Sequence, residues 1–245
     1  MRRLLIALAT LAVAAPASAA DVQVAVAANF TAPARDIAAA FEKKSGDHVL
    51  LSFGSSGAFY AQIAHGAPFE VFLSADAERP QKAEAEGFGV AGSRFTYAVG
   101  QLVLYSTKAG LVDRGGAVLK HGGFDKLAIA DPATAPYGAA AMQTMAALGV
   151  ADALAPKLVR GSSITQAYQF VATGAADLGF VALSQVIAVP GGSRWLVPAG
   201  LHAPIAQQAI LLKPGAGDPG ARAFLKFLRS PAAVTIIRRY GYRPG

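Results

Sequence analysis

The sequence predicts an α/β protein of two lobes that face each other across a cleft. One observation is a unit that occurs four times: a short apolar strand ends in a turn rich in Asn, Ser, Gly or Pro, and a helix begins at that turn. The other is the position of these units, two before Gly100 and two after it. Because ligands bind outside the carboxyl ends of strands in open α/β sheets, the two lobes would line the cleft with backbone amides.

Residues Met1–Ala20 have the pattern of a cleaved signal peptide. The basic residues Arg2 and Arg3 precede an apolar run, Leu4–Ala15, and small residues follow it up to Asp21. The apolar run is too short to span a bilayer, and no later run reaches spanning length. The sequence therefore predicts an exported protein whose mature chain begins at or just before Asp21.

Composition excludes several classes of function. The chain has no cysteine, which excludes thiol nucleophiles, Cys-zinc sites and a lipid-modified N-terminal cysteine. We therefore expect a protein free in the periplasm. Without Arg2 and Arg3, Lys plus Arg falls from 22 to 20 against 15 acidic residues, a net charge of +5. These charges are spread along the chain, so no nucleic-acid partner is expected. No metal-ligand spacing relates the histidines, and no metal site is expected at His48, His65, His121 and His202.

The first unit is Val22–Pro33, whose valines alternate with small or polar residues as in a strand. This strand delivers Asn29 to a helix N-terminus, where unpaired N–H groups favour an anion. Thr31 is the predicted N-cap, Pro33 is tolerated in the first turn, and Gly46 ends the helix.

The second unit pairs the strand His48–Phe53 with the turn Gly54-Ser55-Ser56-Gly57. The Ser56 hydroxyl either caps the following helix or faces a ligand, and the sequence leaves both roles open. A third strand, Glu70–Ser74, and a charged helix, Asp76–Glu86, follow.

The second half of the chain begins with a long predicted strand, Phe95–Ser106, which passes between the lobes at Gly100. The third unit is the strand Leu127–Ala130, the loop Asp131–Gly138 and the Ala-rich helix Ala139–Leu148. Amides near Tyr137 lie at the start of that helix.

The fourth unit is the strand Leu158–Arg160, the turn Gly161-Ser162-Ser163-Ile164 and a helix. Another strand, Asp177–Ala182, follows it.

Four segments resemble the periplasmic molybdate-binding proteins, receptors of molybdate ABC transporters. These segments are AANFTAPARDIAAAFEKKSG, FGSSGAFYAQIAHGAPFEVFLSAD, IADPATAPYGAAA and the terminal RRYGY. The resemblance covers essentially the whole mature chain. It implies a two-lobed periplasmic-binding-protein fold of type II, each lobe a mixed sheet flanked by helices. Residues 21–100 with 201–245 would form lobe 1 and residues 101–200 lobe 2, and the segment Pro219–Tyr242 would pack back onto lobe 1.

The resemblance also implies a site. Carried over residue by residue, the family's ligand-binding positions are Asn29, Ser56, Tyr137 and Ile164, with Ala28, Ser55 and Ser163 as second-rank candidates. Many members have Ser at the first position, Ala at the third, and a later Tyr where this chain has Ala182. The pairing of Asn with Tyr resembles a known subset of the family.

The chemistry of the turns supports an oxyanion independently of the resemblance. A doubly charged tetrahedral oxyanion has only acceptor oxygens, and amides and hydroxyls at helix ends supply donors. Phosphate keeps a proton near neutral pH and would favour a carboxylate acceptor, but the nearest acid, Asp131, is expected to cap its own loop.

The function implied is therefore a monomeric, non-enzymatic receptor with no cofactor. It would bind molybdate, and tungstate as a close second ligand, and deliver it to permease subunits in the inner membrane. The alternatives are a receptor for sulfate or another tetrahedral oxyanion, and an exported serine hydrolase using Ser56.

Overall fold

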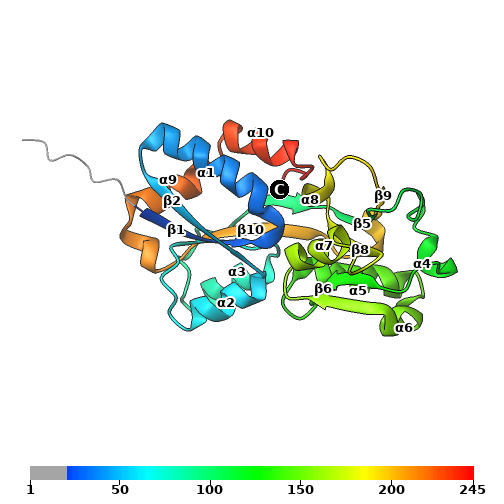
Figure 1. Ribbon diagram of the computed structural model, residues 1–245. Helices are drawn as coiled ribbons and strands as arrows, with labels where there is room; N and C mark the ends of the chain where they lie inside the picture. The colour runs from blue at the N-terminus through cyan, green and yellow to red at the C-terminus, as the bar shows by residue number, and fades with distance from the viewer. Residues whose placement is uncertain (1–20) are drawn as a thin grey trace, which may run out of the picture.

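The computed structural model describes residues 21–245, and the predicted signal peptide, residues 1–20, lies outside this range. The described chain forms two lobes side by side, each built on a five-stranded sheet (Figure 1). Each sheet contains both parallel and antiparallel pairs, so the predicted α/β fold with a mixed sheet in each lobe is confirmed. No helix within residues 21–245 has the length and apolar character needed to cross a membrane.

The first sheet has the strand order β2-β1-β3-β10-β4. β1 runs parallel to β2 and β3, whereas β10 runs antiparallel to β3 and β4. Helices cover both faces of this sheet, so the valines and the intervening Ala25 of β1 are fully buried. The strands are β1 (Asp21–Ala27), β2 (His48–Gly54), β3 (Val71–Leu73), β4 (Phe95–Gly100) and β10 (Ile205–Leu211).

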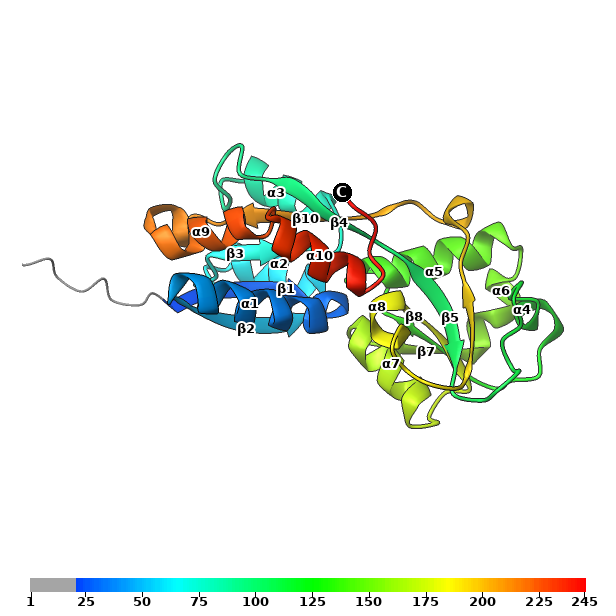
Figure 2. The ribbon, with the colours of Figure 1, turned by 90° about the horizontal axis from the view of Figure 1, so that it is seen from above.

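The helices of this lobe form two layers. One face of the sheet carries three helices, among them the two from the C-terminal segment, and the other face carries two (Figures 1 and 2). Phe41 and Phe224 pack edge to face with centroids 5.4 Å apart, which joins the first helix to the C-terminal segment. The three helices are α1 (Thr31–Ser45), α9 (Pro219–Phe227) and α10 (Pro231–Arg239), and the two are α2 (Ser56–Ala64) and α3 (Glu78–Ala85).

The second sheet repeats the pattern of the first with the order β7-β6-β8-β5-β9. β6 is parallel to β7 and β8, whereas β5 is antiparallel to β8 and β9. Its strands are β5 (Leu102–Ser106), β6 (Leu127–Ala130), β7 (Leu158–Gly161), β8 (Leu178–Ala182) and β9 (Ser193–Leu196).

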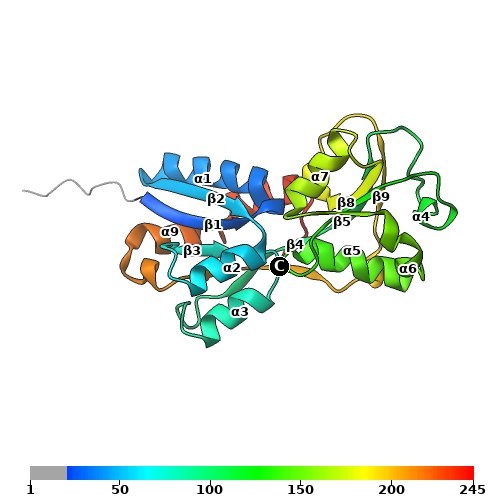
Figure 3. The same ribbon diagram turned by 60° about the horizontal axis from the view of Figure 1, so that its bottom comes forward.

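The two main helices of the second lobe pack on opposite faces of its sheet (Figure 3). They are α5 (Pro136–Ala147) and α7 (Ile164–Ala172). The short helices are α4 (Val118–His121), α6 (Ala151–Leu154) and α8 (Leu183–Val186), and the 3₁₀ turns are η1 (Ala28–Phe30), η2 (Ala155–Lys157), η3 (Ala199–Leu201) and η4 (Pro214–Gly217).

The prediction of one strand over Phe95–Ser106 is wrong. The segment forms two strands, β4 and β5, which belong to different sheets and are separated by Gln101. A Cβ atom on Gly100 would lie 2.2 Å from the hydroxyl oxygen of Tyr137, so only glycine fits where the chain leaves the first sheet. The chain returns between β9 and β10.

The predicted N-cap role of Thr31 is also wrong. The turn η1 runs directly into α1, so Thr31 is the first residue of the helix, and its Oγ1 donates to the carbonyl of Ala28 at 2.8 Å. The end of α1 is as predicted, because Gly46 adopts φ 84°.

Candidate functional site

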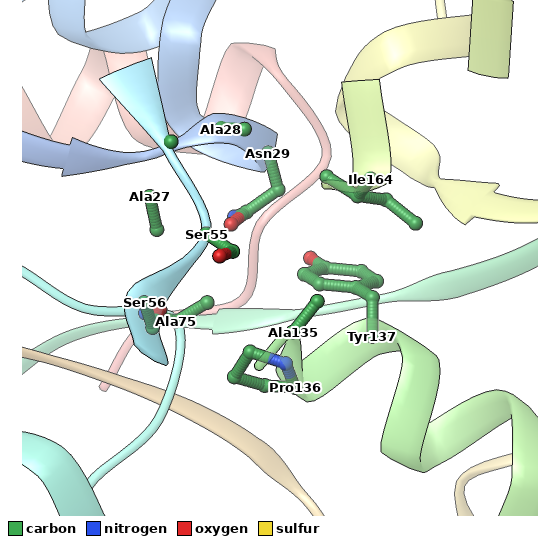
Figure 4. Close-up of a pocket in the computed structure, with 11 residues that line it drawn as sticks. Ala27, Ala28, Asn29, Ser55, Ser56, Ala75, Ala135, Pro136, Tyr137 and Ile164 are labelled. Carbon is green, nitrogen blue, oxygen red and sulfur yellow. The ribbon is translucent and has the colours of Figure 1, made fainter. Parts of the chain in front are cut away.

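A small pocket lies between the lobes, where η1 and α2 of the first lobe face α5 and α7 of the second (Figure 4). The cavity is about 10 Å³, roughly the space that one water molecule needs. Its lining unites all four first-rank positions and two of the second-rank positions predicted from the sequence. The lining residues are Ala27, Ala28, Asn29, Gly54, Ser55, Ser56, Ala75, Ala135, Pro136, Tyr137 and Ile164.

Two serines lie on the first-lobe side of the pocket, and they have different roles. Ser55 is the N-cap of α2, and its Oγ accepts from the N–H of Ala58 at 3.4 Å. Ser56 Oγ accepts from the N–H of Ala75 at 2.9 Å. The capping role that the sequence left open for Ser56 thus belongs to Ser55. Within residues 21–245 no acceptor is recorded for the Ser56 hydroxyl proton, so this proton is available to a ligand.

The second-lobe side is made by the first turns of α5 and α7. Tyr137 follows Pro136 in α5, and Ile164 is the first residue of α7. Ser163, a second-rank candidate, does not line the pocket. It is the N-cap of α7, and its Oγ accepts from the N–H of Gln166 at 3.3 Å.

Helix starts supply free backbone donors to this pocket. The first N–H groups of a helix have no acceptor within it. In the described part of the chain, no partner is recorded for the N–H groups of Ser56, Tyr137 and Ile164. Three such groups from both lobes, each at the positive end of a helix dipole, can donate to one anion.

Every residue that lines the pocket is uncharged. Asp76, next in sequence to the lining residue Ala75, forms an ion pair with Arg79, and Arg79 Nη2 also donates to the carbonyl of Ala133 in the second lobe at 3.0 Å. Asp131 accepts from the N–H of Ala133 at 3.1 Å, so its predicted loop-capping role is confirmed. A ligand would therefore be bound by neutral donors, without a carboxylate acceptor in the lining.

A buried polar cluster lies behind the pocket, and the sequence analysis missed its centre, Gln207. Asn29 Nδ2 donates to Gln207 Oε1 at 2.9 Å and to the hydroxyl of Tyr242 at 3.0 Å. Tyr97 also donates to Gln207 Oε1 at 2.9 Å, and Gln207 Nε2 donates to the hydroxyl of Tyr137 at 3.4 Å. Gln207 belongs to a strand and not to one of the four strand-to-helix turns, so only the fold could reveal it.

The tyrosines of this cluster keep their protons near neutral pH. Burial raises the pKa of Tyr97 and of Tyr137 well above the ordinary value, and it raises the pKa of Tyr242 to about 12. The hydroxyls are therefore neutral groups that can donate as well as accept.

Hydrogen bonds hold the lobes closed around the pocket. The hydroxyl of Tyr242 donates to the carbonyl of Asn29 at 2.7 Å and lies 3.0 Å from Ser184 Oγ, and Ser184 Oγ donates to the same carbonyl at 2.8 Å. Across the pocket, the N–H of Gly57 donates to the carbonyl of Thr134 at 2.9 Å. The cavity is small because these contacts hold the two lobes together on both sides of it.

Within residues 21–245, Ser56 Oγ has one recorded hydrogen bond, from the N–H of Ala75. In the described part of the chain, no three His, Cys, Asp or Glu side chains are arranged to hold a metal ion. Two of the histidine rings contact carbonyls near them in the chain: His65 Nδ1 lies 2.7 Å from the oxygen of Ala61, and His202 Nδ1 lies 2.7 Å from that of Ala203.

Comparisons with known proteins agree with this geometry. Residues 22–243 match the family model described as bacterial extracellular solute-binding protein. The chain is 57% identical to the molybdate-binding protein ModA of Azotobacter vinelandii, over 99% of this chain and 97% of that protein. It is 59% identical to ModA of Rhodobacter capsulatus, over 94% and 90% of the two chains. The solved periplasmic molybdate-binding protein of Azotobacter vinelandii superimposes with a TM-score of 0.89 and 44% identity, covering 91% of this chain and 99% of that one.

Proposed function

The chain belongs to the bacterial extracellular solute-binding proteins and, among them, to the molybdate-binding proteins, and from this premise we propose that it captures molybdate in the periplasm for an ABC transporter. The observation that carries the proposal is the pocket between the lobes, where helix starts from both lobes present uncharged donors. Tungstate, which has the same charge and geometry, would bind as well.

The proposed ligand contacts follow from the free donors. Asn29 would use its backbone N–H, and its side chain once the amide nitrogen is turned toward the ligand, and Ser56 would use its N–H and hydroxyl. Tyr137 and Ile164 would donate through backbone N–H groups. Because the closed cavity of about 10 Å³ has room for little more than one water molecule, a tetrahedral oxyanion would enter with the lobes apart. Contacts from both lobes would then stabilise the closed form around it.

The same proposal covers the organisation of the chain. Residues 21–100 with 201–245 would form one lobe and residues 101–200 the other. Residues 1–20 would be removed on export. The mature protein would act as a monomer that docks on permease subunits in the inner membrane.

A binding protein, and not a hydrolase, is the function that the relatives' names support. Ser56 also lacks the environment of a nucleophile, since its Oγ contacts only a backbone N–H among the described residues.

Calorimetric titration of the mature, ligand-free protein tests the proposal. Molybdate, tungstate, sulfate and phosphate are added in turn. Tight one-to-one binding of molybdate and tungstate, with weak or no binding of sulfate, is the expected result. A preference for sulfate would keep the site but assign another transporter, and no binding of any of the four would overturn the proposal.

A further inference from the structure

Gln207 is the fully buried centre of the cluster behind the pocket. It lies at a bulge of β10, where the register against β4 shifts between Gln207 and Gln208. Bulges redirect side chains, and here the two consecutive glutamines make separate contacts. Gln207 contacts pocket residues, whereas Gln208 accepts from Arg94 Nη1 at 2.7 Å and donates to Thr96 Oγ1 at 3.1 Å.

The contacts of Asn29 leave its side-chain oxygen facing the pocket. Both hydrogens of the amide nitrogen are used, one by Gln207 Oε1 and one by the hydroxyl of Tyr242. Asn29 Oδ1 has no recorded hydrogen-bond partner among residues 21–245. Every fully buried side-chain oxygen in this range does have a partner, so Asn29 Oδ1 is not fully buried and lies at the surface of the cavity. Figure 4 shows the end of the side chain directed into the pocket, toward Ser55. An acceptor at this place would repel a fully deprotonated oxyanion.

Turning over the amides of Asn29 and Gln207 together removes this conflict at the cost of one hydrogen bond. The Tyr242 proton moves from the carbonyl of Asn29 to Asn29 Oδ1, and Ser184 Oγ alone then donates to that carbonyl. Asn29 Oδ1 then accepts from Gln207 Nε2 and from Tyr242, at the positions that now hold Asn29 Nδ2. Gln207 Nε2 also donates to Tyr97, whose own proton goes to the carbonyl of Ser74, 3.2 Å away. Gln207 Oε1 accepts from the hydroxyl of Tyr137. Neither amide can turn alone, because two oxygens or two nitrogens would then meet at 2.9 Å.

We propose that Gln207 is a positioning residue that sets which end of the Asn29 amide faces the pocket. With both amides turned, the site presents Asn29 Nδ2 as a donor to an oxyanion that carries no proton. In the arrangement described here the site presents Asn29 Oδ1, an acceptor suited to an oxyanion that carries a proton. The coupled pair thus selects the protonation state of the ligand. This inference rests on the proposed function, because it concerns the same pocket.

Nuclear magnetic resonance of the wild-type protein tests the reversal directly. In the closed arrangement described here, the Gln207 side-chain amide donates to Tyr137, and its protons should show contacts to that ring. After saturation with molybdate, these contacts should be replaced by contacts to Tyr97. Persistence of the Tyr137 contacts in the molybdate complex would overturn the inference. This measurement needs no variant, so it decides the question even if substitutions at Gln207 prevent folding.

The variant Gln207→Met tests selection, with Gln208→Met as the matched control. Loss of a fixed donor to a charged ligand should weaken molybdate binding by about 10- to 100-fold in Gln207→Met. Gln208→Met should bind like the wild type. The affinity of Gln207→Met for phosphate at pH 6, where phosphate carries protons, should fall less than its affinity for molybdate. The ratio of the two affinities should therefore be smaller in Gln207→Met than in the wild type.

The outcomes separate the inference from the proposed function. An equal loss of both ligands in Gln207→Met would indicate a purely structural role and overturn the inference. Unchanged molybdate binding in Gln207→Met would overturn it as well. Failure of the wild type to bind molybdate would instead overturn the proposed function.

Discussion

At the scale of single residues, consecutive serines at one helix start have separate tasks. Ser55 caps α2, and this leaves the hydroxyl of Ser56 to the pocket, where the N–H of Ala75 fixes its oxygen. A hydroxyl held by an accepted hydrogen bond and with a free proton is a pre-oriented donor. Such a group loses little conformational entropy when it binds an anion.

Replacement of Ser56 by Ala should weaken molybdate binding by about 1–3 kcal/mol, the contribution of one hydrogen bond to a charged group. Calorimetry measures this loss. Ser163→Ala is the matched control, because Ser163 caps α7 outside the pocket. It should lower the free energy of unfolding by about 1 kcal/mol and leave affinity unchanged. Equal affinity in Ser56→Ala and the wild type would remove Ser56 from the site.

At the scale of elements, the start of β8 is tied to its surroundings by one carboxylate. Asp177 Oδ1 accepts from Lys108 Nζ at 2.6 Å, and its Oδ2 accepts from the N–H groups of Asp125 and Lys126 at 2.9 and 3.0 Å. These contacts lower the pKa of Asp177 to about 2. The hydrogen bond from Lys108 is the largest cause, and the two backbone N–H groups add to it. The carboxylate therefore connects the segment after β5, the loop before β6 and the start of β8, at the end of the strands opposite the pocket.

The stabilisation from Asp177 should depend on pH. Its pKa is lower in the folded protein, about 2, than in the unfolded chain, about 4, so the contribution is present above pH 4 and is lost as the pH falls to 2. Asp177→Asn should lower the free energy of unfolding at pH 7 by about 1 kcal/mol, because partial exposure screens the ion pair. Denaturant titration of both proteins from pH 7 to pH 2 measures the difference. A difference that does not shrink below pH 4 would contradict this account.

At the scale of the whole molecule, closure depends on the close approach of α2 to the loop before α5. The N–H of Gly57 donates across the cleft to Thr134, and a Cβ atom on Gly57 would lie 2.9 Å from Thr134 Cα. Gly57 has an ordinary helical backbone, so this contact between lobes, and not a local strain, requires glycine there.

Gly57→Ala should therefore oppose closure and leave each lobe folded. Overpacking costs about 1–3 kcal/mol, and here the cost falls on the closed form alone, so molybdate affinity should decrease by about 10- to 100-fold. Small-angle scattering of the molybdate complex should show a more extended molecule than the wild type. Gly217→Ala, where a Cβ would meet open space, is the control. A variant that closes and binds like the wild type would refute this role.

The sequence by itself determined the local units of this protein. Apolar strands, Ser and Gly turns and helix starts depend on short-range patterns, and these located Asn29, Ser56, Tyr137 and Ile164 near the starts of helices. The resemblance then indicated that these helix starts share one site. Local signals are weaker where neighbouring turns merge. The N-cap assigned to Thr31 was wrong because η1 runs directly into α1.

Only the tertiary structure decided how these units meet. The apolar pattern of Phe95–Ser106 is the same for one strand or two, and only pairing with different sheets separates β4 from β5. Gln207 has no local signal at all, since its partners Asn29, Tyr97 and Tyr137 are 178, 110 and 70 residues away. Long-range packing places a buried amide where its hydrogen bonds must all be satisfied, and that requirement connects the strand to the pocket.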